Sequence, residues 1–68
     1  MKFSEFLKQI KKERKISQES LGFEIDQSPQ SVSYMMNDKR FPRIDEVEHI
    51  AEVLGYEVVY VKKGQLNE

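Results

Sequence analysis

The chain has 68 residues, a formal net charge of -1, a pI near 5.8 and no cysteine. A single domain of this size has a small core and buries only roughly 60% of its unfolded surface, so we expect it to need a partner. The lack of cysteine excludes disulfides and cysteine-based sites, and the single histidine cannot build a zinc site unaided. We therefore expect no metal, no cofactor and no enzymatic activity.

The N-terminus is charged within its first residues, and no long apolar run follows it. This pattern predicts neither a signal peptide nor a membrane span. A cytoplasmic protein that does not bind membranes is the expectation.

Charge is unevenly distributed along the chain. Residues 1–15 carry six positive and two negative charges, whereas residues 44–57 carry five negative charges and no lysine or arginine. Lys39, Arg40 and Arg43 are close together in the sequence between these regions. A local positive rim of this kind can bind phosphates while an acidic helix faces away, although the three cations could also be solvated loop charge.

Two helices are predicted in the first part of the chain. Phe3, Phe6, Leu7 and Ile10 recur at helical spacing, which predicts a helix over about 3–14. Its lysines are typical of a solvated face. Ser17 offers a capping oxygen for a short second helix over about 18–25, and Asp26 follows where a left-handed backbone is useful.

Two more helices follow the break at 25–28. Ser28-Pro29 is a strong start signal, because serine caps and proline lacks an amide hydrogen that the first turn would leave unpaired. This third helix runs to about Met36, with Val32, Met35 and Met36 facing inward and small and amide side chains at its start. After a loop over 37–42, apolar residues from Ile44 to Leu54 at helical spacing predict a fourth helix that ends at Gly55.

A strand is predicted over 56–61. This segment is rich in β-branched and aromatic residues, and no other segment of the chain resembles a strand. An unpaired apolar edge favours pairing with another chain. We expect the strands of two copies to pair antiparallel through five residues, Tyr56, Val58, Val59, Tyr60 and Val61, although these side chains could be satisfied within one subunit.

The segment 17–42 resembles the helix-turn-helix of the Cro and phage-repressor family, also called the XRE family. The similarity runs without gaps from about Phe6 to Gly55, and Ser17-Gln18-Glu19-Ser20 is especially close to the start of helix two in lambda-type repressors. Its other anchors are Leu7, Ile16, Leu21, Ser28, Val32, Asn37, Pro42, Ile50-Ala51 and Leu54-Gly55. The resemblance implies a mainly α, four-helix, lambda-repressor-like domain over 1–55. The family often closes with a fifth helix, whereas the composition of this chain predicts a dimerisation strand over 56–63 and a flexible tail over 64–68.

The resemblance also implies roles for individual residues. Gln18 would hold a phosphate and brace a recognition-helix side chain, and Gln30 would read bases, since an amide can bond adenine N6 and N7 together. The loop residues would bind the DNA backbone without specifying sequence. The full expected DNA-binding set is Ser17, Gln18, Ser28, Pro29, Gln30, Ser31, Ser33, Tyr34, Asn37, Lys39, Arg40 and Arg43.

Five positions depart from the family pattern. Gly22 stands where relatives usually have alanine, and both residues are small enough for a close helix crossing. Asp26 replaces the turn glycine. Lys11 and Met36 stand where many members have an arginine and a glutamate, so that ion pair is absent, and Pro29 removes one potential base contact.

These observations favour a sequence-specific DNA-binding transcriptional repressor of the phage or mobile-element kind, which acts as a homodimer on a near-palindromic operator of double-stranded DNA. The alternative is an antitoxin-like protein-interaction module whose DNA binding is secondary. The acidic net charge of the chain and its apolar predicted strand support that alternative, in which a toxin would be the partner. An enzyme has no residue constellation to support it.

Overall fold

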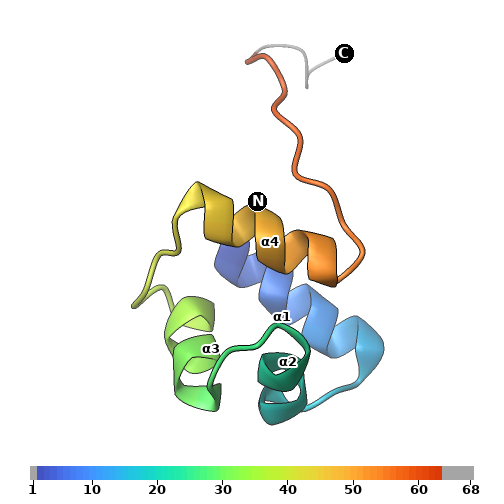
Figure 1. Cartoon of the computed structure of the whole chain (residues 1–68), viewed down its shortest axis with the longest axis vertical. Helices are drawn as coiled ribbons and strands as arrows, with labels where there is room; N and C mark the ends of the chain where they lie inside the picture. The colour runs from blue at the N-terminus through green and yellow to red at the C-terminus, as the bar shows by residue number, and fades with distance from the viewer. Residues whose placement is uncertain (1, 64–68) are drawn as a thin grey trace.

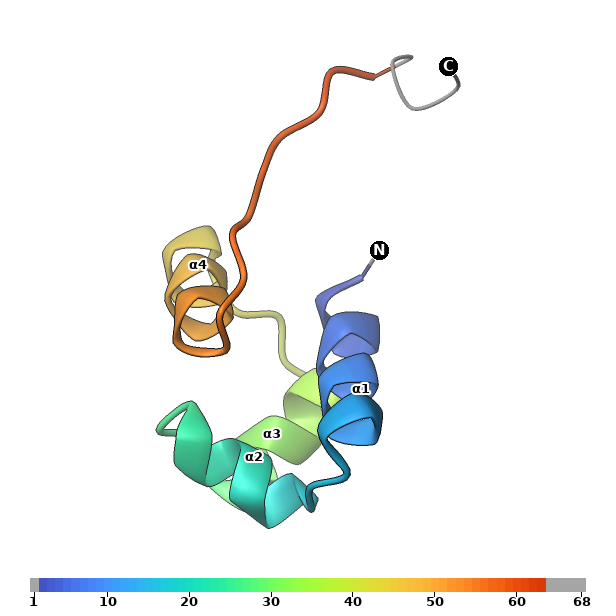
Figure 2. The same cartoon turned by 90° about the vertical axis from the view of Figure 1, so that its right-hand side faces the viewer.

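The computed structural model describes residues 2–63, which form four helices (Figures 1 and 2). The helices are α1 (Phe3–Arg14), α2 (Gln18–Glu24), α3 (Pro29–Met36) and α4 (Ile44–Val53). The predicted mainly helical fold and the order of its elements are confirmed. The tail predicted over 64–68 lies outside the described residues.

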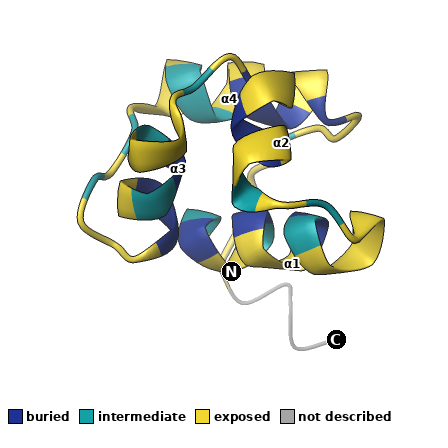
Figure 3. Cartoon of the chain, turned by 90° about the horizontal axis from the view of Figure 1, so that it is seen from below, coloured by how far each residue is buried: buried dark blue, intermediate teal, exposed yellow. Residues whose placement is uncertain are grey.

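The core lies between the four helices, and α3 packs against both α1 and α2. Figure 3 shows the buried parts of the helices, with exposed segments on the outside. Every helix contributes at least two buried residues, since each has one apolar face. The buried hydrophobic residues are Leu7, Ile10, Leu21, Ile25, Val32, Met35, Met36, Ile50, Ala51 and Leu54.

The two short helices of the motif begin with serine caps. Ser17 Oγ accepts a hydrogen bond of 3.0 Å from the Ser20 amide, and Ser28 Oγ accepts one of 3.1 Å from the Ser31 amide. Each cap satisfies an amide that the first turn would otherwise leave unpaired. Pro29 occupies the first turn of α3, as predicted.

The turn between α2 and α3 depends on two unusual positions. Asp26 has a φ of 57°, so it adopts the left-handed conformation predicted for it. The chain then doubles back, and the Gln27 amide donates to the Gly22 carbonyl at 2.8 Å. A Cβ atom at Gly22 would lie 2.5 Å from the Gln27 carbonyl oxygen. The expectation that alanine would fit equally well at this crossing is therefore wrong.

Arg14 connects the C-terminal ends of three helices. Its guanidinium donates to the Leu54 carbonyl beyond α4 and lies 3.9 Å from Glu24 Oε1. Cations stabilise the C-terminal end of a helix, where carbonyls are unpaired.

Met36, which stands where relatives have a charged partner, is buried in the core instead.

The chain leaves α4 through a left-handed turn at Gly55, whose φ is 89°. The Gly55 amide donates to the Glu52 carbonyl at 2.9 Å, and the Tyr56 amide donates to the Ala51 carbonyl at 2.8 Å. These two hydrogen bonds form a Schellman motif. The ring of Tyr56 then packs edge-on against Phe6, with 5.0 Å between the centroids. The predicted end of α4 at Gly55 is thus confirmed.

The strand predicted over 56–61 does not form within the single chain. Residues 56–62 are neither helix nor strand, and no part of residues 2–63 is a strand. The reason is that a strand requires ladder hydrogen bonds, whereas the rest of the described chain is helices and their connections. The segment 56–63, called the C-terminal arm below, extends away from the helices in Figure 1.

None of the described helices is long and apolar enough to cross a membrane. Nor does any group of three or more histidine, aspartate or glutamate side chains within residues 2–63 come together as a candidate metal site.

Candidate nucleic-acid interface

The outer face of α3 carries a continuous polar stripe. Gln30, Ser33, Tyr34 and Asn37 are spaced by three, one and three residues, which places them on one side of a helix, opposite the buried Val32. The stripe is internally hydrogen-bonded, since Gln30 Nε2 donates to the Tyr34 hydroxyl at 3.0 Å and Asn37 Nδ2 donates to the Ser33 carbonyl at 2.8 Å. Four of the predicted DNA-binding residues therefore share one outward surface.

The hydrogen bond within this stripe leaves Gln30 with binding capacity. An amide side chain has two N–H donors and a carbonyl acceptor, and Tyr34 takes only one of the donors. The remaining donor and the acceptor are the pair that an adenine edge requires. Tyr34, which is 42% exposed, accepts through its oxygen and keeps its own hydroxyl hydrogen for another partner.

Ser31 lies on a different side of α3 from the stripe. Its hydroxyl donates to Gln27 Oε1 at 2.7 Å, and the residue is half-buried. A hydroxyl that already donates to the protein can only accept from another group. Ser31 is therefore brought close to the turn, and the chemistry that it offers to an outside partner is that of an acceptor.

Helix α2 braces α3 through Gln18. Its Nε2 donates to the Pro29 carbonyl at 3.1 Å, so the brace reaches the backbone of α3, whereas a side-chain partner was expected. Within residues 2–63 the side-chain oxygen of Gln18 accepts no hydrogen bond, which leaves it available as an acceptor. Ser17 is exposed, and its hydroxyl both donates to the Ser20 hydroxyl and accepts from the Ser20 amide. Its main role in the structure is therefore to cap α2.

The loop after α3 carries the three clustered cations. The amides of Lys39 and Arg40 both donate to the Tyr34 carbonyl, at 2.8 and 3.2 Å, and fix the start of the loop to the last turn of α3. Lys39 and Arg43 are exposed. Their charges extend the α3 surface with positive groups of the kind that bind phosphates.

Arg40 is held differently from its two neighbours. Its Nη2 donates to Glu46 Oε2 at 2.8 Å, in the first turn of α4. The expectation that the acidic helix faces away from the positive rim is wrong at this point, because Glu46 faces the loop. The other acidic residues of α4, Asp45, Glu48 and Glu52, are exposed.

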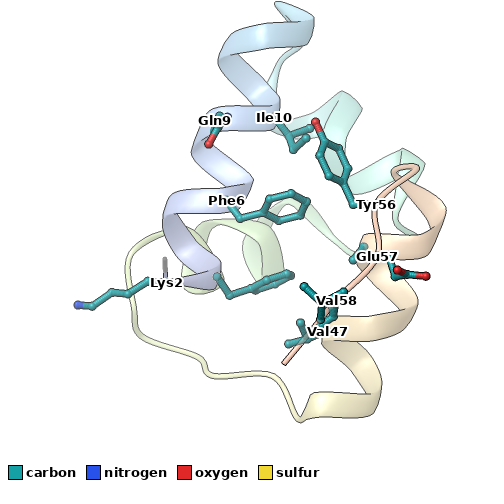
Figure 4. A pocket seen from close by; sticks show the side chains of 11 residues that line it. Lys2, Phe6, Gln9, Ile10, Val47, Tyr56, Glu57 and Val58 are labelled. Atoms are coloured by element: carbon teal, nitrogen blue, oxygen red, sulfur yellow. The ribbon is translucent and has the colours of Figure 1, made fainter. Parts of the chain in front are cut away.

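A second surface lies between α1, α4 and the C-terminal arm. Phe6, Ile10, Val47, Tyr56 and Val58 line an open groove of about 530 Å³ (Figure 4). Tyr56 and Val58 are partly covered by this packing within the chain. Val59, Tyr60 and Val61 are 65%, 77% and 50% exposed. The predicted dimer residues thus divide into three that line the groove, Tyr56, Val58 and Val59, and two that do not, Tyr60 and Val61.

The sequence did not predict that Gln27 and Glu46 belong to the site. Gln27 precedes Ser31 by four residues across the cap of α3, which is the spacing of a helical contact. Glu46 follows the cationic loop closely, and its opposite charge was a signal for pairing with Arg40. Gln27 Nε2 also approaches Glu46 Oε2 at 3.4 Å, so both residues join one polar network behind the recognition surface.

Helices α2 and α3, the sharp turn between them and the outward polar face of α3 define a helix-turn-helix domain. The family model described as Helix-turn-helix matches residues 7–61, and the chain belongs to this family, in its XRE-type branch. It is a family of DNA-binding regulatory domains and not of enzymes. Searches of curated proteins and of solved structures found no match.

Proposed function

We propose that this protein is a sequence-specific transcriptional repressor of phage or mobile-element type, which acts in the cytoplasm as a homodimer on a near-palindromic operator. The observation that carries the proposal is the exposed polar stripe of α3 beside a cationic loop. Amide and hydroxyl groups at that position suit base edges in the major groove. Occupying promoter DNA would then prevent transcription.

The proposed contacts separate into two kinds. Gln30 reads a base directly, with Ser31, Ser33 and Tyr34 as further readers around it. Lys39 and Arg43 bind phosphates, as do Ser17, Gln18, Asn37 and Arg40. Ser28 and Pro29 lie at the N-terminal end of α3, which enters the major groove. Base contacts specify the sequence, whereas phosphate contacts fix the position of the protein on the duplex.

Dimerisation is proposed to use the C-terminal arm. Val59, Tyr60 and Val61 expose apolar side chains on a segment with no ladder partner in residues 2–63. Antiparallel pairing with the arm of a second copy would satisfy that backbone and bury those side chains. Residues 1–55 would then bind DNA and residues 56–63 would join the two copies.

Selection of bound sequences from a random DNA library tests the proposal directly. We expect a near-palindromic site with half-sites centred about 10 base pairs apart. Gln30→Ala should cost about 1–3 kcal/mol at one base position of each half-site and relax the preference there. Arg43→Ala should weaken binding to all sequences by a similar factor.

Gln9→Ala is the matched control, because it makes the same change at an exposed position of α1, on the groove side of the molecule. It should leave the selected sequence unchanged. A library with no enriched sequence would refute the proposed function, and an equal effect of Gln9→Ala and Gln30→Ala would refute the docking of α3.

The exposed apolar residues of the C-terminal arm also support a second candidate, an antitoxin-like module that binds a toxin. Co-expression with the product of a neighbouring small reading frame tests it. A complex that is lost in Tyr60→Lys but retained in Gln30→Ala would favour this candidate, and no complex would reject it.

A further inference from the structure

The guanidinium of Arg40 makes one ion pair within the protein and has unused donors. Nη2 donates to Glu46 Oε2 at 2.8 Å, whereas Nη1 is buried and has no hydrogen-bond partner within residues 2–63. An arginine offers five N–H donors, so a single carboxylate oxygen satisfies only a fraction of them. Buried donors without partners are unfavourable, so the pair with Glu46 leaves the guanidinium of Arg40 incompletely satisfied.

The pair lies at the edge of a polar surface hollow. This hollow has a volume of about 440 Å³, and Arg40, Arg43 and Glu46 contribute to its lining. Phosphate and carboxylate oxygens bind the same planar edge of a guanidinium. Because Nη1 is buried, a phosphate in the hollow can meet that edge fully only after the Arg40 side chain turns away from Glu46.

We propose that Glu46 is a positioning residue that competes with DNA phosphate for Arg40. In the free protein its carboxylate occupies the guanidinium. On DNA, Arg40 exchanges this carboxylate for a phosphate. The proposal rests on the proposed DNA-binding function and adds to it a residue that lies outside the expected contact set.

The competition lowers affinity without changing sequence preference. A phosphate contact carries no base information, so the cost of releasing Arg40 is the same for operator and unrelated DNA. Each phosphate neutralised by the protein adds about 0.9 to the slope of log K against log salt concentration. With Glu46 in place, Arg40 contributes less than one full contact to that slope.

The test compares Glu46→Gln with Glu48→Gln. Both substitutions remove one negative charge from α4, but Glu48 is exposed and has no ion pair among the described residues, which makes it a control for net charge. Binding to the selected operator and to an unrelated duplex is measured by fluorescence anisotropy between 50 and 300 mM KCl, concentrations chosen so that ~0.9 of slope per contact is resolved.

We expect Glu46→Gln to bind both duplexes about three- to tenfold more tightly than Glu48→Gln at roughly 0.1 M salt, with a steeper salt slope, by up to about 0.9. The ratio of operator to unrelated affinity should stay within about twofold, since only a phosphate contact is gained. In an Arg40→Gln background, Glu46→Gln should lose this advantage over Glu48→Gln. Circular dichroism checks that each variant keeps its helices.

The possible failures are distinguishable. If the wild-type protein binds no operator, the proposed function fails and the role of Glu46 fails with it. If the wild type binds and the two glutamine variants have equal affinities and slopes, only the role of Glu46 is refuted. An advantage of Glu46→Gln that persists in the Arg40→Gln background would likewise refute competition for Arg40.

Discussion

Gly22 and Asp26 together make the turn of the motif. The left-handed backbone at Asp26 brings the Gln27 carbonyl so close to Gly22 that a side-chain carbon has no room. The sequence predicted the conformation of Asp26, since aspartate tolerates a positive φ. It did not predict the steric demand at Gly22, because that demand depends on the direction in which the carbonyl points after the turn.

Gly22→Ala should destabilise the protein although alanine is the better helix former. In an open helical position this change gains about 1 kcal/mol. Here the added carbon would lie 2.5 Å from backbone oxygen and 3.2 Å from the side chain of Val32, so overpacking should cost about 1–3 kcal/mol instead. Thermal unfolding of the wild type and the variant measures the sign of this change in stability.

Gly55 provides the comparison for this prediction. A Cβ atom there meets nothing within 4 Å, but φ is 89°, so the cost of a side chain is backbone strain alone. Asparagine tolerates that conformation better than alanine. Gly55→Asn should therefore be milder than Gly55→Ala, whereas Gly22→Asn should be worse than Gly22→Ala. The same order at both sites would contradict a steric role for Gly22.

The helices themselves were well predicted from the sequence. Apolar spacing fixed the inward faces, and the serine, proline and glycine signals fixed the ends, because these are local effects of a few neighbouring residues. The partners of polar side chains were not predicted. The bonds of Gln18 to Pro29 and of Arg40 to Glu46 depend on how separate elements pack.

Ser28→Ala tests the cap of the recognition helix. Loss of the 3.1 Å bond to the Ser31 amide should cost about 1 kcal/mol, in a helix of only eight residues. For a domain of this size that lowers the melting temperature by roughly 4–8 °C. Ser33→Ala, in the middle of the same helix, is the control, since the Ser33 hydroxyl caps no backbone amide and accepts only a long, 3.5 Å bond from Asn37 Nδ2. Equal melting temperatures for the two variants would contradict the role of Ser28.

The arrangement of two copies is a property of the whole molecule. The strand predicted over 56–61 does not form in the single chain, because the ladder hydrogen bonds that a strand requires have no partner within residues 2–63. The same limit applies to the dimer residues. Apolar composition indicated a segment that binds another chain, and the exposure of Val59, Tyr60 and Val61 agrees with this interpretation. The identity of the binding partner depends on a second surface, which the composition of the arm does not specify.

Sedimentation equilibrium of the full chain should give a dimer at tens of micromolar. Tyr60→Lys places a charge in the proposed pairing surface and should shift the protein to monomer, with a matching loss of affinity for the palindromic site. Lys62→Ala, a change in the same arm away from the apolar residues, should remain dimeric. A wild-type protein that sediments as a monomer would refute the homodimer.

The contact between Phe6 and Tyr56 has a consequence for the DNA sequence itself. It fastens the start of the C-terminal arm to α1, which in turn packs on α3. In the proposed dimer, the direction of the arm therefore determines how far apart and at what angle the two recognition helices lie. Phe6 and Gly55 would then help to set the distance between the two recognition helices. Substitutions there should change the preferred number of base pairs between half-sites while leaving the bases read within each half-site the same.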